Sequence, residues 1–394
     1  MQIGWVDFSK DERNKVLNVI NLLDEPGAVD ELGLGIIRDA FSDYFFPGTS
    51  TVQTRAKYFL VVPYILKEAG SGMYGENPNE IIRRIDEEER HCRDLFLKHS
   101  VDGVIGRRNP SGWVLRTPMN IYWNGIKKLD IFRSNLSVYE YIRYESALRN
   151  SKKLKNYGHR VKETEDSDID DNDAGDFSSF QFWNLGVTYS SDWRNDLTID
   201  LRPDEASFLK ERIITSQRNS LFAHLLINEV PLDRYESFGA LTAEIISSVD
   251  EDLRFLIMLA NDFNNLVSIV TTRYNLIVSQ DRNSKALEQW DLYSKDIERR
   301  SSVDLNSIYA RLRIKNSSLK VFLKNVQKAL IENDIEEVDR LIIKREIENK
   351  DRSRAKVLKA GEYNPDVWIG LDVLDYRFHD AKRIIKDIVA AEEI

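Results

Sequence analysis

The chain has 394 residues, enough for two or three domains with separate hydrophobic cores. Its composition of 42% hydrophobic and 31% charged residues is typical of a globular protein, and only 18 Gly and 9 Pro argue against a turn-rich all-β fold. The net charge of -9 excludes a protein coated in basic residues. The single cysteine, Cys92, excludes a disulfide framework and a multi-cysteine zinc site. We expect no metal site and no cofactor.

The N-terminal residues lack a basic region followed by an apolar core, so they do not resemble a secretion signal. The longest apolar run, residues 58–66, has about half of the ~20 residues that a membrane-spanning helix needs. We therefore expect a cytoplasmic protein that does not enter a membrane.

Apolar residues recur at helical spacing along most of the chain, which predicts a mainly α-helical fold. Pro47 and Gly48 end one expected helix, and three hydroxyl residues from Thr49 onwards precede the next one. Helices are expected at 31–46, from about 51 onwards, at 80–98, at 118–129 and at 251–278.

The section after residue 101 has a different character. Short apolar runs on both sides of Asn109-Pro110-Ser111-Gly112 predict a hairpin, and Thr117-Pro118 then predicts the start of a short helix. The spacing buries one side of that helix and exposes Asn120 and Asn124 on the other. A hairpin beside such a helix resembles a winged-helix module, in which the hairpin more often follows the helix. The buried positions are expected to be Met119, Tyr122, Ile126 and Leu129.

Charge gives the clearest boundary. Residues 103–162 contain 13 Lys and Arg against three acids, a net charge of +10, whereas residues 163–176 contain eight acids and no base. A block of like charges is usually solvated and flexible. We therefore expect a helical, winged-helix-like domain at 1–162, an acidic linker at 163–176 and an α-helical scaffold domain at 177–394.

The basic stretch is the first candidate site. Clustered cations neutralise phosphates, and a helix that presents Asn and Lys suits the edges of bases. The alternative is a solvated basic face that pairs with the acidic block. Candidate nucleic-acid-binding residues are Arg107, Arg108, Arg116, Asn120, Asn124, Lys127, Lys128 and Arg133, with Trp113, Tyr122 and Trp123 between them.

A second candidate precedes the expected helix at 51. Hydroxyl groups and free N–H groups at a helix start favour an anion, and two cations one turn later would add charge. The alternative is ordinary capping, with the cations solvated or paired to acids. The residues of this candidate phosphate site are Thr49, Ser50, Thr51, Arg55 and Lys57.

A third candidate is the pair Arg218 and His224. The segment RNSLFAH resembles the Arg–polar–His signature of the helical HEPN ribonucleases, which implies metal-independent RNA cleavage by these two residues. Five residues separate Arg from His here, whereas the commonest form of that motif has four. Surrounding apolar residues favour the alternative, a histidine packed within a helix.

Several segments resemble an uncharacterised bacterial family, a domain of unknown function. They are GWVDFS (4–9), EPGAVDELG (25–33), FFPGTST (45–51) with QTRAKYFL (53–60), and 113–132. The resemblance implies a setting beside helicases and phospholipase-D-like nucleases in phage-defence gene clusters. It implies no catalytic residues.

We expect a non-enzymatic nucleic-acid-binding or adaptor subunit of a bacterial phage-defence system, with DNA favoured over RNA and a helicase or nuclease as a possible protein partner. Two alternatives remain open. One is the HEPN-like ribonuclease, and the other is a structural scaffold whose basic and acidic segments pair with each other.

Overall fold

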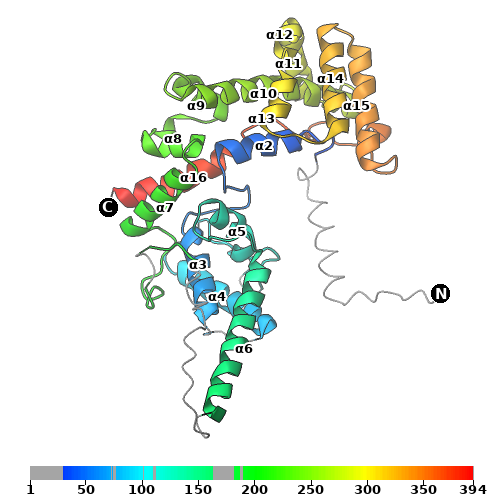
Figure 1. The fold of residues 1–394 in the computed structure, drawn as a ribbon. Coiled ribbons are helices and arrows are strands. Elements are labelled where there is room, and N and C mark those ends of the chain that lie inside the picture. Colours follow the sequence, from blue (N-terminus) through cyan, green and yellow to red (C-terminus); the bar gives the residue numbers. More distant parts are fainter. Residues whose placement is uncertain are drawn as a thin grey trace, which may run out of the picture. The chain divides into compact units, whose positions relative to one another are not determined.

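The computed structural model describes residues 30–393, with gaps at 72, 74–76, 101, 110–111, 163–181 and 187–189 (Figure 1). These residues are mainly α-helical, and their β-structure is limited to one bridge between Phe132 and Trp183. The predicted mainly α fold is therefore confirmed. The described residues form two compact units: unit 1 contains residues 30–42 and 235–376, and unit 2 contains residues 43–234 and 377–393 apart from the gaps given above.

This division differs from the expected domains 1–162 and 177–394. The segment that follows the acidic block belongs to the same unit as the segment before it. Trp183 donates its indole N–H to the hydroxyl of Tyr141 at 2.9 Å, and Arg194 donates to the buried carboxylate of Glu68 at 2.9 Å. Buried side chains thus join the two sides of the expected boundary. The linker 163–176 itself lies outside the described residues.

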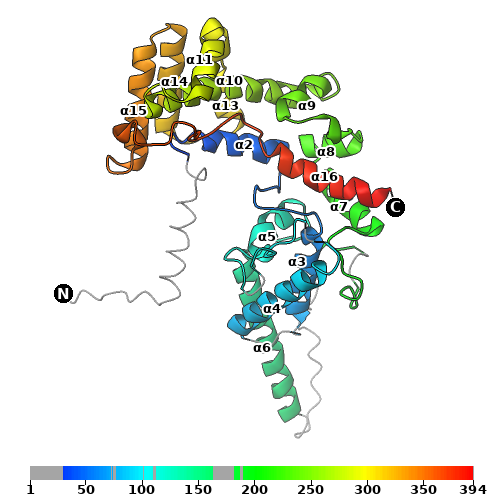
Figure 2. The ribbon, with the colours of Figure 1, turned by 180° about the vertical axis from the view of Figure 1, so that it is seen from behind.

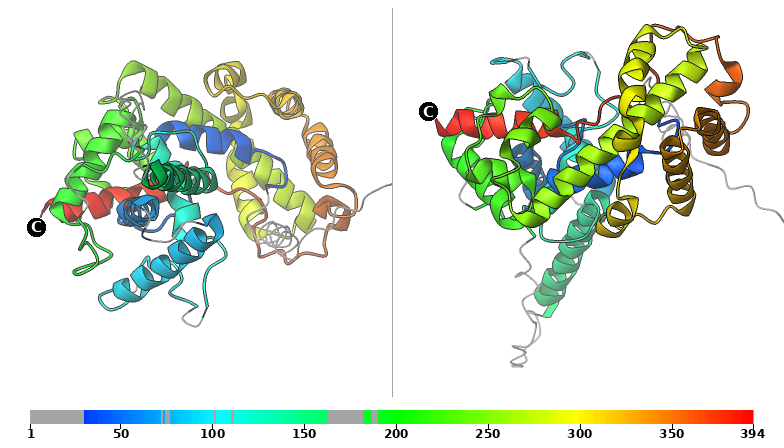
Figure 3. Two further views of the ribbon diagram at one scale, coloured as in Figure 1. Left: turned by 60° about the horizontal axis from the view of Figure 1, so that its bottom comes forward. Right: turned by 90° about the horizontal axis from the view of Figure 1, so that it is seen from above.

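Unit 1 is built around one long helix, α10, which runs through it without a break (Figure 3). Asp250 caps this helix by accepting a hydrogen bond from the backbone N–H of Leu253 at 2.9 Å. The helices of the unit are α2 (Gly35–Phe45), which ends in unit 2, α9 (Phe238–Ile245), α10 (Glu251–Ser279), α11 (Ser284–Tyr293), η3 (Ser294–Asp296), α12 (Ile297–Ser301), α13 (Leu305–Arg311), α14 (Ser317–Ile331), α15 (Ile335–Lys350) and η4 (Lys356–Lys359).

The apolar residues of α10 form the core of unit 1. By length and composition α10 could cross a membrane, but 56% of its most apolar stretch is buried within the protein. Two of its polar residues hold a later segment in place: Asn264 accepts from the N–H of Leu374 at 2.9 Å, and Asn275 exchanges two hydrogen bonds with the backbone of Ile369. Core packing therefore accounts for the apolar character of this helix.

Unit 2 packs its helices around aromatic side chains, among them Tyr58, Phe96 and Tyr122. Helices α7 and α16 lie side by side, and the C-terminal half of α6 extends beyond the other helices of the unit (Figures 1 and 2). The helices are α3 (Tyr58–Ser71), α4 (Pro78–Phe96), α5 (Pro118–Lys128), α6 (Val138–Lys162), α7 (Pro203–Ser216), α8 (Leu221–Ile227), η2 (Leu232–Arg234) and α16 (Phe378–Glu392).

The section before α5 forms turns where the sequence predicted a hairpin. Residues 102–109 and 112–117 contain no strand. Arg93 of α4 donates to the backbone carbonyls of Asn109 and Gly112 at 3.4 and 3.1 Å, and the N–H of Ile105 donates to the hydroxyl of Tyr58 at 2.9 Å. Side chains therefore bind backbone groups that a β-ladder would have paired. The predicted start of the next helix at Pro118 is confirmed.

Candidate nucleic-acid interface

Helix α5 is fastened to α4 by the carboxylate of Glu89. This side chain is buried and accepts a hydrogen bond from the N–H of Met119 at 2.5 Å, in the first turn of α5. The N–H groups of a first turn have no partner inside their own helix, so a side-chain oxygen that accepts there stabilises the helix start. Burial raises the pKa of Glu89 to about 8, against the opposing effect of the Met119 hydrogen bond.

The loop before α5 is held on α4 as well. The ring of Trp113 lies next to the guanidinium groups of Arg90 and Arg93, whose central carbons are 5.7 and 5.5 Å from the ring centroid. Together with the Arg93 hydrogen bonds to the loop carbonyls, these contacts fix the segment that carries Arg107, Arg108 and Arg116. The described residues of this loop, which we call the basic loop, are therefore held against α4.

The two faces of α5 are those that the sequence predicted. Met119, Tyr122 and Ile126 are buried, whereas Asn120 and Asn124 are exposed. Lys128 is also exposed and Lys127 is half-buried. Residues three and four apart lie on one helix face, so Asn120, Asn124 and the two lysines form one polar stripe, which we call the α5 stripe.

Two of the three aromatic residues that the sequence interleaves with the cations, Tyr122 and Trp123, belong to the core. The hydroxyl of Tyr122 accepts from the N–H groups of Thr54 and Arg55 at 2.8 and 3.1 Å. Trp123 is buried and donates its indole N–H to the carbonyl of Leu136 at 3.2 Å. These rings therefore support the interface from beneath and are not available to stack on a base.

Apart from the half-buried Lys127, the cations of the interface are exposed. Arg107 lies 3.9 Å from Asp102, and Arg133 lies 3.5 Å from Asp130. Arg108, Arg116 and Lys128 are exposed and form no ion pair with another residue in the described part of the chain. These three cations are therefore free to meet an external anion.

Helix α6 brings an aromatic residue to the α5 stripe. A capping box starts this helix: Glu140 accepts from the N–H of Ser137 at 2.7 Å, and Ser137 accepts from the N–H of Glu140 at 3.2 Å. The box places Tyr139 beside α5, where its hydroxyl donates to the side-chain oxygen of Asn120 at 3.3 Å. The sequence carries no signal that Tyr139 lies at this stripe, although the Ser-x-x-Glu pattern at 137–140 is typical of a helix start.

The second candidate site has a different geometry from the one expected. Helix α3 begins at Tyr58, not near residue 51, because the N–H groups of residues 54–56 bind Tyr122 and Asp387. Thr49 is buried and donates its hydroxyl to the carbonyl of Phe46 at 2.7 Å, and the hydroxyl of Ser50 accepts from the N–H of Val52 at 3.4 Å. Thr51 is exposed in a turn. The three hydroxyls therefore do not cap α3.

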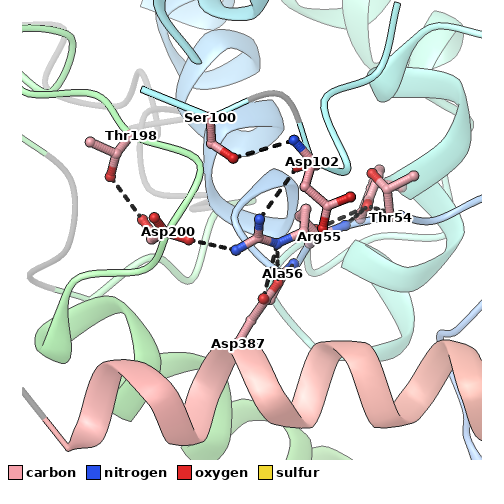
Figure 4. Close-up of polar contacts among 9 residues, drawn as sticks. Thr54, Arg55, Ala56, Ser100, Asp102, Thr198, Asp200 and Asp387 are labelled. Atoms are coloured by element: carbon pink, nitrogen blue, oxygen red, sulfur yellow. Dashed lines mark hydrogen bonds and ion pairs between the residues drawn. The ribbon is translucent and has the colours of Figure 1, made fainter. Parts of the chain in front are cut away.

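Carboxylates of the chain itself surround Arg55 (Figure 4). Its Nε donates to both oxygens of Asp387 on α16 at 2.9 and 3.0 Å, and one terminal nitrogen donates to Asp200 at 2.6 Å. Asp387 also accepts from the N–H of Ala56 at 2.7 Å. The carboxylate of Asp387 thus occupies the place at the helix start where the sequence predicts a phosphate. Burial raises the pKa of Asp387, while Arg55 and Ala56 act in the opposite direction.

Lys57 is neutralised in the same way. Its side chain is 2% exposed, and its ammonium group lies 2.6 Å from the carboxylate of Glu205, which is fully buried. Burial lowers the pKa of Lys57, and the charge of Glu205 opposes that effect. The two cations of the candidate phosphate site are therefore paired within the protein.

The candidate ribonuclease residues lie around the start of α8. Arg218 is exposed in the turn before the helix, whereas His224 lies one turn inside it and is half-buried. The Nδ1 atom of His224 is 3.3 Å from the amide nitrogen of Asn228. Neighbouring residues Leu221 and Phe222 are buried, as the packed-helix alternative predicts. The ribonuclease activity stays a prediction.

Comparison with known proteins gives one match. Residues 1–181 match a family of unknown function, DUF6361. The match supports an uncharacterised domain in the first part of the chain and covers the α5 stripe, Arg55 and Lys57. No curated protein and no solved structure matches the chain.

Proposed function

We propose that this chain is a non-enzymatic nucleic-acid-binding subunit that contacts phosphates with the basic loop before α5 and with the α5 stripe. One observation carries the proposal: Arg108, Arg116 and Lys128 are exposed and form no ion pair within the described part of the chain. Exposed cations that form no ion pair with a described residue are available to neutralise phosphates.

Helix α6 adds to this support. Its backbone continues as a helix to Lys162, and residues 146–162 contain six Lys and Arg and no acid. The protein as a whole carries a net charge of -9. Attraction of a polyanion would therefore be local to this part of unit 2, and should weaken steeply with salt, because each phosphate contact releases bound counterions.

The test is binding of a labelled 30-nucleotide DNA, as single strand and as duplex, measured by fluorescence anisotropy. We expect binding at about 50 mM salt that weakens at least tenfold at about 200 mM salt. The triple variant Arg108→Ala/Arg116→Ala/Lys128→Ala should weaken binding and lower the salt slope by about two to three, since each lost phosphate contact lowers it by roughly one.

A matched control removes the same charge from unit 1. Lys315, Lys324 and Arg352 are exposed and form no ion pair with a described residue. The variant Lys315→Ala/Lys324→Ala/Arg352→Ala should leave the affinity within about twofold of the parent. Equal losses of DNA affinity in the two triple variants would mean that binding depends only on the net charge of the protein and not on the position of the cations. An absence of binding at about 50 mM salt would contradict the proposal and favour the scaffold alternative.

We propose DNA over RNA, and a bacterial phage-defence complex with a helicase or nuclease as the setting. The sequence resemblance supports the setting, and the family match adds an uncharacterised domain. Co-purification of the tagged chain with the products of neighbouring genes tests the complex. RNA cleavage in EDTA that His224→Ala abolishes would contradict the non-enzymatic proposal.

A further inference from the structure

Resting on the proposed function, we propose that the interface recognises single-stranded nucleic acid, with an unpaired base stacked on the ring of Tyr139. The geometry that points to this ligand is an exposed, anchored aromatic ring at the end of a stripe of amide and cationic side chains.

Tyr139 is exposed although it is aromatic. It is 42% exposed, whereas Tyr141, two residues later on the same helix, is 1% exposed. Its hydroxyl donates to Asn120, whose amide in turn donates to the hydroxyl of Thr117 at 3.1 Å. The ring is thus tied through Asn120 to Thr117, the residue just before α5. An aromatic platform held in this way loses little freedom when a base stacks on it.

The groups around the ring suit a nucleotide strand. Arg143 is exposed and lies one turn after Tyr139 on the same face of α6. Asn124 and then Lys128 follow Asn120 along the α5 stripe at successive turns. Amides can bind the edges of bases, while cations bind phosphates, so the arrangement offers a strand one stacking surface and several polar contacts.

The acid in this region is engaged elsewhere. The carboxylate of Glu140 accepts from the N–H of Ser137 at the start of α6. The pKa of Glu140 is lowered, first by these contacts with Ser137 and further by the charges of Lys127 and Arg143. The negative charge of Glu140 therefore stabilises the start of α6, and the positive charges of Lys127 and Arg143 lie near it.

The close packing of α5 against the rest of unit 2 argues against binding in the major groove of a duplex. A helix that reads the major groove must project from its protein. Gly125 of α5 is buried, and a Cβ atom at this position would lie 2.4 Å from the carbonyl oxygen of Gly48 and 2.6 Å from the ring of Phe59. Helix α5 is thus embedded against the backbone, with one stripe exposed. Paired bases are already stacked on both faces, so the Tyr139 ring can serve an unpaired base only.

The test compares single-stranded and duplex 20-nucleotide DNA by fluorescence anisotropy of the full chain. The parent should bind the single strand at least about fivefold more tightly than the duplex. Tyr139→Leu should weaken single-strand binding about tenfold and duplex binding less than about twofold, while Tyr139→Phe, which keeps the ring, should stay within about threefold of the parent. Phe255→Leu removes an exposed aromatic of unit 1 that lies beside Arg311 and should change neither affinity.

The outcomes separate this inference from the proposed function. Equal binding of single strand and duplex, or an equal loss of both in Tyr139→Leu, would overturn the single-strand inference and leave nucleic-acid binding in place. A similar loss in Tyr139→Phe would overturn the stacking role. Binding of an acidic peptide without binding of either DNA would overturn both proposals. Thermal unfolding of each variant, with melting points equal to that of the parent, shows that a change in affinity is not a loss of folded protein.

Discussion

Unit 2 contains two groups of cations that differ in their surroundings. Arg55 and Lys57, before α3, are enclosed and paired with Asp387 and Glu205. Arg108 and Lys128, around α5, are exposed and form no ion pair with a described residue. The cations before α3 are paired with carboxylates of the protein itself. We propose that the exposed cations around α5 bind the anion of a partner instead. Clustering of basic residues is therefore a poor guide to binding unless burial and pairing are known.

Energetics explain why the two groups are not interchangeable. A buried cation must be paired, because the loss of hydration costs several kcal/mol. An exposed cation keeps its hydration and contributes about 0–1 kcal/mol even when it is paired. The first group therefore depends on its internal partners, whereas the second does not need a partner within the protein.

The largest effect is expected at Lys57. Lys57→Met leaves the carboxylate of Glu205 buried without its ammonium partner and should lower the free energy of unfolding by about 3–5 kcal/mol, measured by urea denaturation. The double variant Lys57→Met/Glu205→Gln removes both charges and should recover more than half of that loss. A loss below about 1 kcal/mol in the single variant would contradict the contrast between buried and exposed cations.

Glu89 lies beneath the exposed group, and its effect depends on pH. Its pKa of about 8 in the folded protein exceeds the ordinary 4.5 of a glutamate, so between these values the native state binds a proton that the unfolded chain has released. Stability is therefore lost as the pH rises through this range. Glu89→Gln keeps an acceptor for Met119 and should remove this contribution, worth about 2–3 kcal/mol between pH 5.5 and 7.5.

Urea denaturation of the parent and of Glu89→Gln at both pH values measures this change in the free energy of unfolding. Nucleic-acid binding should change little, because the variant alters the support of α5 and none of its exposed cations. An unchanged pH slope in Glu89→Gln would show that this carboxyl does not titrate as its burial implies.

The sequence predicted what local spacing determines. The faces of α5 follow from helical periodicity, so Met119 and Ile126 were expected inside and Asn120 outside. Pairing of Arg55 and Lys57 with acids was one of the alternatives, but the partners could not be predicted, because these carboxylates are 332 and 148 residues away in the chain. The predicted hairpin is absent for a similar reason. The side chains of Arg93 and Tyr58, which lie earlier in the chain, form hydrogen bonds with backbone groups of the loop.

Asp387 and Asp200 allow a comparison on one guanidinium group. Both bind Arg55, but the side chain of Asp387 is 13% exposed and that of Asp200 is 69% exposed. Asp387→Asn removes a buried charge that also binds the N–H of Ala56 and should cost about 1–2 kcal/mol of unfolding free energy. Asp200→Asn should cost less than about 0.5 kcal/mol. Equal losses would show that burial does not decide the strength of these pairs.

The smallest effect on stability is expected where the effect on binding is largest. Arg108→Ala/Arg116→Ala/Lys128→Ala removes three exposed cations that have no ion-pair partner within the described residues, so the free energy of unfolding should change by less than about 0.5 kcal/mol. Urea denaturation at low salt measures the change. A loss of unfolding free energy above about 1 kcal/mol would show that these residues have a structural role, which would contradict the proposal that they bind nucleic acid.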